Sequence, residues 1–125
     1  MTPVEDFMVT LINNQNYDTE IQQAHRPVLL LCMPKGPDFY DQSIILHQLA
    51  EKHPADLKAC LLEEELINGF RQMLGIKGTP VFLLFNRGKE RGRMLGMANG
   101  AKLSAFLYQH LPNPVWDTVE ASPWD

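Results

Sequence analysis

Continuous apolar runs are the clearest pattern in this chain. Val28–Met33 and Val81–Phe85 are continuous apolar runs of strand length, and Leu57–Leu62 is a third strand-length run that is apolar except for Lys58. Such runs are typical of strands that are buried on both sides of a central sheet. After the turn Asn86-Arg87-Gly88, the segment Lys89–Leu95 is predicted to return beside the third run as a hairpin.

In the segments between these runs, apolar residues recur at the spacing of helices. A short helix is predicted from Asn16 to Ala24, and a long one follows Pro37 and stops at Pro54. The core contacts expected from the long helix are Phe39, Ile44, Ile45, Leu46 and Leu49. Strands that alternate with helices predict an α/β protein with a mixed central sheet and helices on both faces.

Two further helices have recognisable ends. Glu63-Glu64-Glu65 opens one of them, because acidic side chains suit the positive end of a helix, and Gly75 suits its C-cap. Asn99 is predicted to cap a final helix that runs to about Leu111.

The start of the chain also carries a helix signature. Thr2 can cap, Pro3 suits the first helical position, and Glu5 completes a capping box. Helical spacing is followed by Val4, Phe7, Met8, Leu11 and Ile12. We therefore predict a helix over residues 2–12.

Length and composition indicate one globular domain. The chain has 125 residues, of which 45% are hydrophobic, enough for a real core. We place the domain at residues 1–111 and a proline-broken acidic tail at residues 112–125. The tail repeats a theme, Pro114-Val115-Trp116-Asp117 and then Ser122-Pro123-Trp124-Asp125. This repeat is typical of a docking peptide, and folding back over the domain is the alternative.

Charge and cysteine content exclude several classes of protein. A formal net charge of -4 argues against nucleic-acid binding through bulk charge. No run approaches the roughly 18 apolar residues of a membrane span, and no signal peptide is expected at the N-terminus. Two cysteines in apolar runs form no disulfide framework, which favours a cytoplasmic location.

The segment Leu74–Gly88 carries a resemblance to a known family. Its residues Gly75-Ile76-Lys77-Gly78-Thr79-Pro80 and the following strand to Gly88 resemble the thioredoxin family's G-I-x-G-x-P-T-x-x-x-F-x-x-G segment. Family features extend from Asn16 to Leu111. The resemblance implies a thioredoxin-like three-layer sandwich. It also implies that the Thr79–Pro80 peptide bond is cis and faces the family's active site.

The other half of that site departs from the family. Where thioredoxins carry C-x-x-C, this chain reads Gly36-Pro37-Asp38-Phe39. A register one residue later places Pro37 and Tyr40 at the two cysteine positions, and neither register supplies a thiol. Thioredoxin-like hydrogenase-maturation proteins also lack C-x-x-C, and they are a narrower possibility within the resemblance.

These features predict a redox-inactive protein that binds another protein or an extended peptide, as an adaptor or chaperone-like factor. Strand addition through main-chain hydrogen bonds needs no thiol. The expected binding groove comprises Gly36, Pro37, Asp38, Phe39, Tyr40, Thr79, Pro80 and Met97, with Met33 as a further lining residue. No cofactor is expected. No metal site is expected either, because the four histidines show no tight ligand spacing.

Two rival features remain. Cys32 lies at the end of the predicted central strand, where ligands of α/β sheets gather, so a monothiol oxidoreductase is the alternative function. A small buried residue is the simpler interpretation. Basic residues that alternate along the last strand are expected to share one face and to hold an acidic partner, a phosphate or only solvent: Arg87, Lys89, Arg91 and Arg93.

Overall fold

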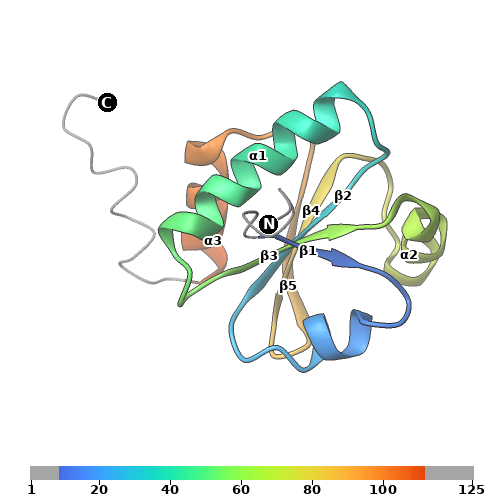
Figure 1. The fold of residues 1–125 in the computed structure, drawn as a ribbon, viewed down its shortest axis with the longest axis horizontal. Helices are drawn as coiled ribbons and strands as arrows, with labels where there is room; N and C mark the ends of the chain where they lie inside the picture. Colours follow the sequence, from blue (N-terminus) through green and yellow to red (C-terminus); the bar gives the residue numbers. More distant parts are fainter. Residues whose placement is uncertain (1–8, 112–125) are drawn as a thin grey trace, which may run out of the picture.

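The apolar runs form the inner strands of a five-stranded sheet (Figure 1). The structure is a computed structural model, and it describes residues 9–111. The strands are β1 (Val9–Ile12), β2 (Val28–Cys32), β3 (Lys58–Leu62), β4 (Val81–Asn86) and β5 (Lys89–Leu95). The helices are η2 (Asp18–Gln22), α1 (Pro37–Lys52), η3 (Glu64–Leu66), α2 (Ile67–Leu74) and α3 (Gly100–His110).

The sheet is mixed, as the sequence predicts. Its strand order is β1-β3-β2-β4-β5. β3 pairs in parallel with both β1 and β2, β4 is antiparallel to β2, and β5 is antiparallel to β4. This order puts the two most apolar strands, β2 and β4, side by side in the middle, where both of their faces are covered.

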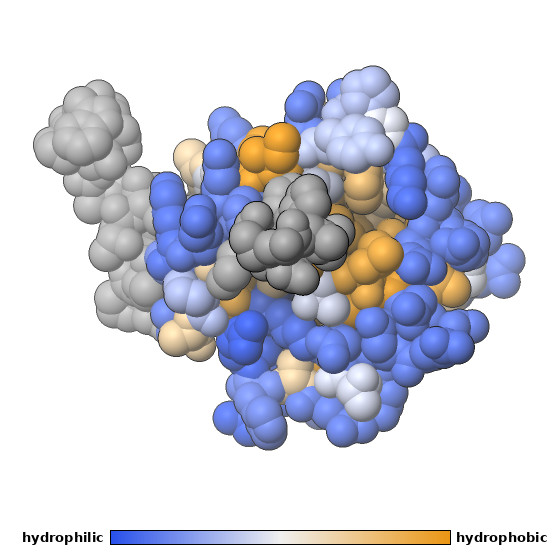
Figure 2. All heavy atoms as spheres, viewed as in Figure 1, coloured by the Kyte–Doolittle hydropathy of each residue, from blue (hydrophilic) through white to orange (hydrophobic). Residues whose placement is uncertain are grey.

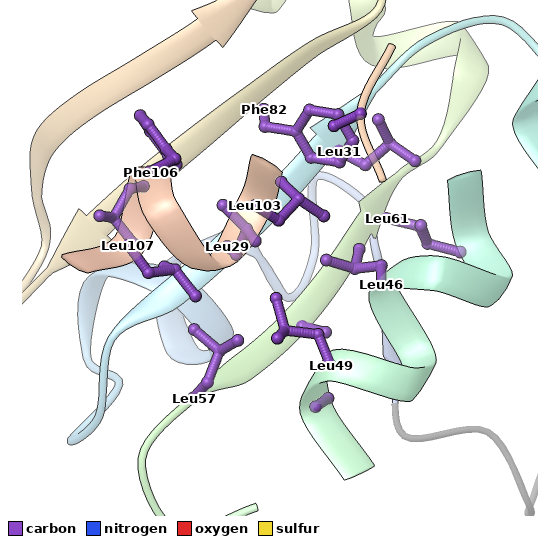
Figure 3. Packing of buried hydrophobic residues seen from close by; sticks show 14 of the residues in the cluster. Leu29, Leu31, Leu46, Leu49, Leu57, Leu61, Phe82, Leu103, Phe106 and Leu107 are labelled. Atoms are coloured by element: carbon purple, nitrogen blue, oxygen red, sulfur yellow. The ribbon is translucent and has the colours of Figure 1, made fainter. Parts of the chain in front are cut away.

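Helices cover both faces of the sheet (Figure 1). Leu29 and Leu31 of β2 point into one core layer, beneath α1 and α3. Figure 3 shows this layer, in which Leu46 of α1 and Leu103 of α3 approach the strand side chains. The intervening residues of β2, such as Leu30, point into the second layer beneath η2 and α2. Alternation along each strand therefore divides the core into two layers.

Residues 9–12 correct the predicted N-terminal helix. They form strand β1, in register with Ala59–Leu62 of β3, and residues 2–8 lie outside the described part of the chain. The apolar spacing of Leu11 and Ile12 fits a helix. A parallel ladder with β3 instead satisfies the backbone and buries Ile12 completely. Pairing with a distant strand outweighs a local pattern here.

The predictions for the other helices hold with adjustments. Gly75 ends α2 in the left-handed conformation (φ 66°), as expected of a C-cap. Asn99 caps α3, because its side chain accepts a 2.8 Å hydrogen bond from the Lys102 N–H. The helix predicted from Asn16 to Ala24 is shorter in the structure, where it is the π-helical turn η2. Ile44 is wrong as a core residue, since it is 46% exposed and lies about 160° around α1 from Leu46.

A β-bulge in β5 breaks the expected basic face. Leu84 pairs with Gly92 and Phe85 pairs with Glu90, so Arg91 is left without a partner in the ladder. The extra residue brings Glu90 and Arg93 to the same face, where they form an ion pair at 2.6 Å. Lys89, which pairs with Asn86, consequently faces the opposite side from Arg93, and the prediction of one shared basic face is wrong.

Both edges of the sheet are protected against further strand pairing. On β5 the protection comes from the charged residues and the bulge. On β1 the side-chain amide of Asn16 donates a 2.9 Å hydrogen bond to the Leu11 carbonyl. Asn16 also accepts one from the Asn13 N–H. A capped carbonyl on a four-residue strand leaves little backbone for another chain to pair with.

Candidate functional site

A pocket of about 280 Å³ lies where the end of β2 meets the start of β4. The two strands are antiparallel, and Cys32 pairs with Val81. The residues that follow β2 and those that precede β4 therefore lie next to each other, although they are far apart in sequence. The pocket is lined by Met33, Pro34, Lys35, Gly36, Pro37, Asp38, Phe39, Thr79 and Pro80.

One wall, which we call the helix wall, comprises residues 33–39. Gly36 is the N-cap of α1, Pro37 occupies its first turn, and Asp38 places a carboxylate at the positive end of the helix. The loop before the helix is held by a 3.2 Å hydrogen bond from the Lys35 N–H to Oε2 of Glu64 in η3. This wall is a well-formed helix start with one acidic and one basic side chain exposed beside it.

The opposite wall, which we call the loop wall, is Thr79–Pro80. The peptide bond between these residues is cis, as the sequence predicts. The Pro80 carbonyl accepts a 2.8 Å hydrogen bond from the Gly96 N–H. Within residues 9–111, no hydrogen bond involves the N–H or C=O of Thr79. The loop wall therefore has one main-chain donor and one main-chain acceptor that residues 9–111 leave unpaired.

Most of the residues predicted for the groove come together. Gly36, Pro37, Asp38 and Phe39 line the helix wall, and Thr79 and Pro80 form the loop wall. The predicted residues Tyr40 and Met97 lie outside the lining, with 63% and 42% of their surface exposed. Phe39 is also a core residue at 7% exposure, and its ring contacts that of Tyr40 edge-to-face at 5.7 Å.

Gln42 supports the candidate site from outside the pocket lining, and sequence reasoning missed it. It is 3% exposed in α1, and its side-chain amide exchanges two hydrogen bonds of 2.9 Å with the N–H and C=O of Ala98. Ala98 lies two residues after Gly96, which binds Pro80. Gln42 thus connects α1 with the turn that supports the loop wall. The sequence did contain a clue to this role. Gln42 is a polar residue one helical turn after Phe39, on the face of the helix that was predicted to contact the core.

Cys32 is close to the pocket in sequence but does not line it. It is 1% exposed and packs in the second core layer with Cys60. Both thiols are free, and burial raises the pKa of each from 9.0 to about 12. Neutral thiols in the core are poor nucleophiles, so this arrangement disfavours thiol chemistry at neutral pH.

Within residues 9–111, no three His, Cys, Asp or Glu residues lie close enough to hold a metal ion. None of the helices in this part of the chain is both long and apolar enough to cross a membrane.

The chain was also compared with known proteins. No protein-family model matches it, and no curated protein matches it either.

Proposed function

We propose that this chain is a redox-inactive, thioredoxin-like protein that binds an extended segment of another polypeptide, as an adaptor or chaperone-like factor. The observation that carries the proposal is the pocket between the helix wall and the loop wall. It combines unpaired main-chain groups of Thr79 with an apolar lining at Met33 and Phe39. Strand addition uses this combination, since the backbone supplies affinity and a pocket supplies specificity.

The sequence resemblance supports the thioredoxin-like part of the proposal. The residues that resemble the family, Gly75–Gly88, include the loop wall and strand β4. The residues that depart from it, Gly36–Phe39, make up part of the opposite wall. Family-like and divergent segments therefore border the same pocket.

The lining also indicates the class of ligand. A pocket of about 280 Å³ has room for one or two side chains rather than a large cofactor. Apolar atoms of Phe39 and Met33 favour an apolar anchor. Lys35 and Asp38 are both exposed and carry opposite charges, so they do not select a strongly charged peptide of either sign.

The rival function, a monothiol oxidoreductase, has less support. Thiol–disulfide exchange requires an accessible thiolate. None of the nine lining residues of this pocket is a cysteine. Cys32, with its raised pKa, is buried in the core and is not among the lining residues.

The proposal is tested by selecting peptides against the full chain and mapping where they bind. Twelve-residue peptides displayed on phage are selected, synthesised and titrated into ¹⁵N-labelled protein. We expect chemical-shift changes at Gly78, Thr79 and residues 33–39. A useful comparison is β5 with the turn before it, where the signals of residues 87–93 should remain unchanged. Shifts confined to β5 or to residues 112–125 would contradict the proposed site.

A further inference from the structure

An exposed apolar stripe, which we call the α1 stripe, runs along α1 away from the pocket. It comprises Pro37, Tyr40 and Ile44, whose side chains are all exposed. Their spacing of three and four residues places them within about 60° of one another around the helix axis. Figure 2 shows apolar atoms at the surface over α1. The stripe begins at the pocket, because Pro37 is a lining residue and Tyr40 contacts Phe39 of the helix wall.

The balance of charge changes beyond the pocket. At the pocket itself, the exposed side chains of Lys35 and Asp38 carry opposite charges. Asp41, about one turn further along α1, is also exposed, and it forms no ion pair within residues 9–111. It lies one residue after Tyr40 and three before Ile44, so its carboxylate borders one flank of the stripe. An unpaired negative charge at this point favours a ligand that carries a basic residue there.

We propose that the segment bound in the pocket continues along the α1 stripe, where a second apolar residue and a neighbouring Lys or Arg bind. An extended chain advances by about 3.3 Å per residue, and alternate side chains point to the same side. The point midway between Tyr40 and Ile44 lies about 7–8 Å along the helix axis from Pro37. A ligand residue two positions from the residue in the pocket therefore reaches this point, and the basic residue next to it lies beside Asp41.

A second copy of the chain fits the α1 stripe less well. Three side chains on one helix cover much less than the roughly 800 Å² per partner that stable protein–protein interfaces bury. A segment that is already held at Thr79 needs only a modest further contact, because the second contact then forms within one complex. This extension rests on the proposed function, since it concerns the same ligand.

The test uses the full-length chain and the phage-selected twelve-residue peptide that changes the chemical shift of Thr79 at the lowest concentration. Ile44→Ser should weaken the binding of this peptide by about threefold to tenfold, because the second apolar contact is lost. The matched control is Met73→Ser on α2, which removes a similarly exposed apolar side chain and should leave Kd unchanged. Isothermal titration calorimetry measures each Kd, and urea denaturation checks that both variants keep the wild-type stability.

A serine scan of the same peptide locates the apolar contact. One peptide residue should contribute to the affinity for the wild-type protein but not for Ile44→Ser. We expect it two positions from the residue whose replacement removes the shift change at Thr79.

A charge swap tests the basic residue. Asp41→Lys should weaken the peptide by about fivefold or more, and replacing the basic residue of the peptide with glutamate should restore its binding to Asp41→Lys. The control is Glu51→Lys, about 15 Å further along α1 and thus beyond the Debye length of about 8 Å at physiological salt. This control should respond to neither peptide change.

Three outcomes would overturn the proposal while the proposed function stands. One is a Kd that is unchanged by Ile44→Ser although the peptide still changes the shift of Thr79. The second is a charge swap without recovery, or a set of selected peptides without enrichment of Lys and Arg. The third is a shift change at Ile44 that depends on protein concentration without peptide, which would assign the stripe to a second copy. If no selected peptide changes the shifts of Thr79 or residues 33–39, the proposed function fails and this extension fails with it.

Discussion

The two walls of the pocket differ in what they offer a ligand. The helix wall presents side chains: Phe39 from the core, with Lys35 and Asp38 exposed at the surface. The loop wall presents the main chain of Thr79, whose N–H and C=O are unpaired within residues 9–111. Thiol–disulfide exchange would require a cysteine in the pocket lining, and neither wall has one. Main-chain recognition requires only the loop wall, which has the groups for it.

The walls are also stabilised differently. The helix wall continues into α1, whose apolar side chains are anchored in the core. The loop wall depends on hydrogen bonds. The Pro80 carbonyl binds Gly96, and Gln42 then binds Ala98 two residues further on. The loop wall is thus held by a main-chain hydrogen bond and by the side chain of Gln42, and a substitution of Gln42 removes the second of these supports.

The largest effect is expected from removing the connection between the walls. Gln42→Leu should lower the free energy of unfolding by about 2–4 kcal/mol, because it leaves the N–H and C=O of Ala98 buried and unpaired. Urea denaturation measures this loss. The control is Gln48→Leu, at an exposed position of the same helix, which should change stability by less than about 0.5 kcal/mol. Equal effects of the two substitutions would show that the two hydrogen bonds contribute little.

The sequence predicts those parts of this site that depend on local residues. Strand β4 follows from a continuous apolar run, and the C-cap at Gly75 from a residue that tolerates positive φ. The cis bond before Pro80 was implied by a motif of contiguous residues. Each of these features is decided within a few positions of the chain, so a single sequence contains the information.

The parts that failed depend on contacts between distant segments. Residues 9–12 became a strand because β3 was available to pair with them. Lys89 and Arg93 face opposite sides because of a bulge, which appears only in the register of β5 against β4. The role of Gln42 depends on Ala98, 56 residues later. The spacing of residues within one segment gives no information about these contacts between segments.

A smaller effect is expected from Tyr40, the residue of α1 that follows the helix wall, and it tests whether this part of the helix contributes to peptide binding. Tyr40→Ala should weaken a selected peptide by about 1 kcal/mol, or roughly fivefold in Kd, if the exposed ring beside Phe39 acts as an anchor. Stability should hardly change, because Tyr40 is 63% exposed. Isothermal titration calorimetry measures the affinity, and Tyr108→Ala on α3 is the control. An unchanged Kd would confine recognition to the pocket lining and the loop wall.

The next prediction concerns the end of α2, where the chain turns towards the loop wall. Arg93 donates hydrogen bonds to the carbonyls of Leu74 (2.8 Å) and Gly75 (3.3 Å) at the end of α2, while it pairs with Glu90. Arg93→Ala should lower thermal stability by about 0.5–1 kcal/mol, because the interaction is largely exposed to solvent. Arg91→Ala, at the bulge, should have no measurable effect. The reverse order would contradict this role for Arg93.

The smallest expected effect is a null result on the thiol chemistry of Cys32, which precedes the helix wall in the sequence and lies in the core. Cys32→Ala should leave the rate of insulin reduction by dithiothreitol unchanged, because we expect the wild-type protein to add nothing to that rate. The raised pKa of Cys32, about 12, leaves on the order of 10⁻⁴ of the thiol ionised at pH 8, and its burial blocks access. Turnover that disappears in Cys32→Ala would instead give the helix side a catalytic thiol.

The same pKa fixes a pH dependence that checks the burial of this thiol independently. The folded-state pKa of about 12 lies above the ordinary value of 9.0, so the neutral thiol stabilises the fold. This stabilisation is fully present below pH 9 and is lost as pH rises from 9 towards 12. Cys60 has the same shift, so Cys32→Ala should reduce the alkaline destabilisation without abolishing it. Urea midpoints at pH 7.5 and 10 measure the difference. If the urea midpoint of Cys32→Ala falls between pH 7.5 and 10 by as much as that of the wild-type protein, Cys32 ionises as freely in the folded protein as in the unfolded chain. That result would favour the monothiol alternative for Cys32.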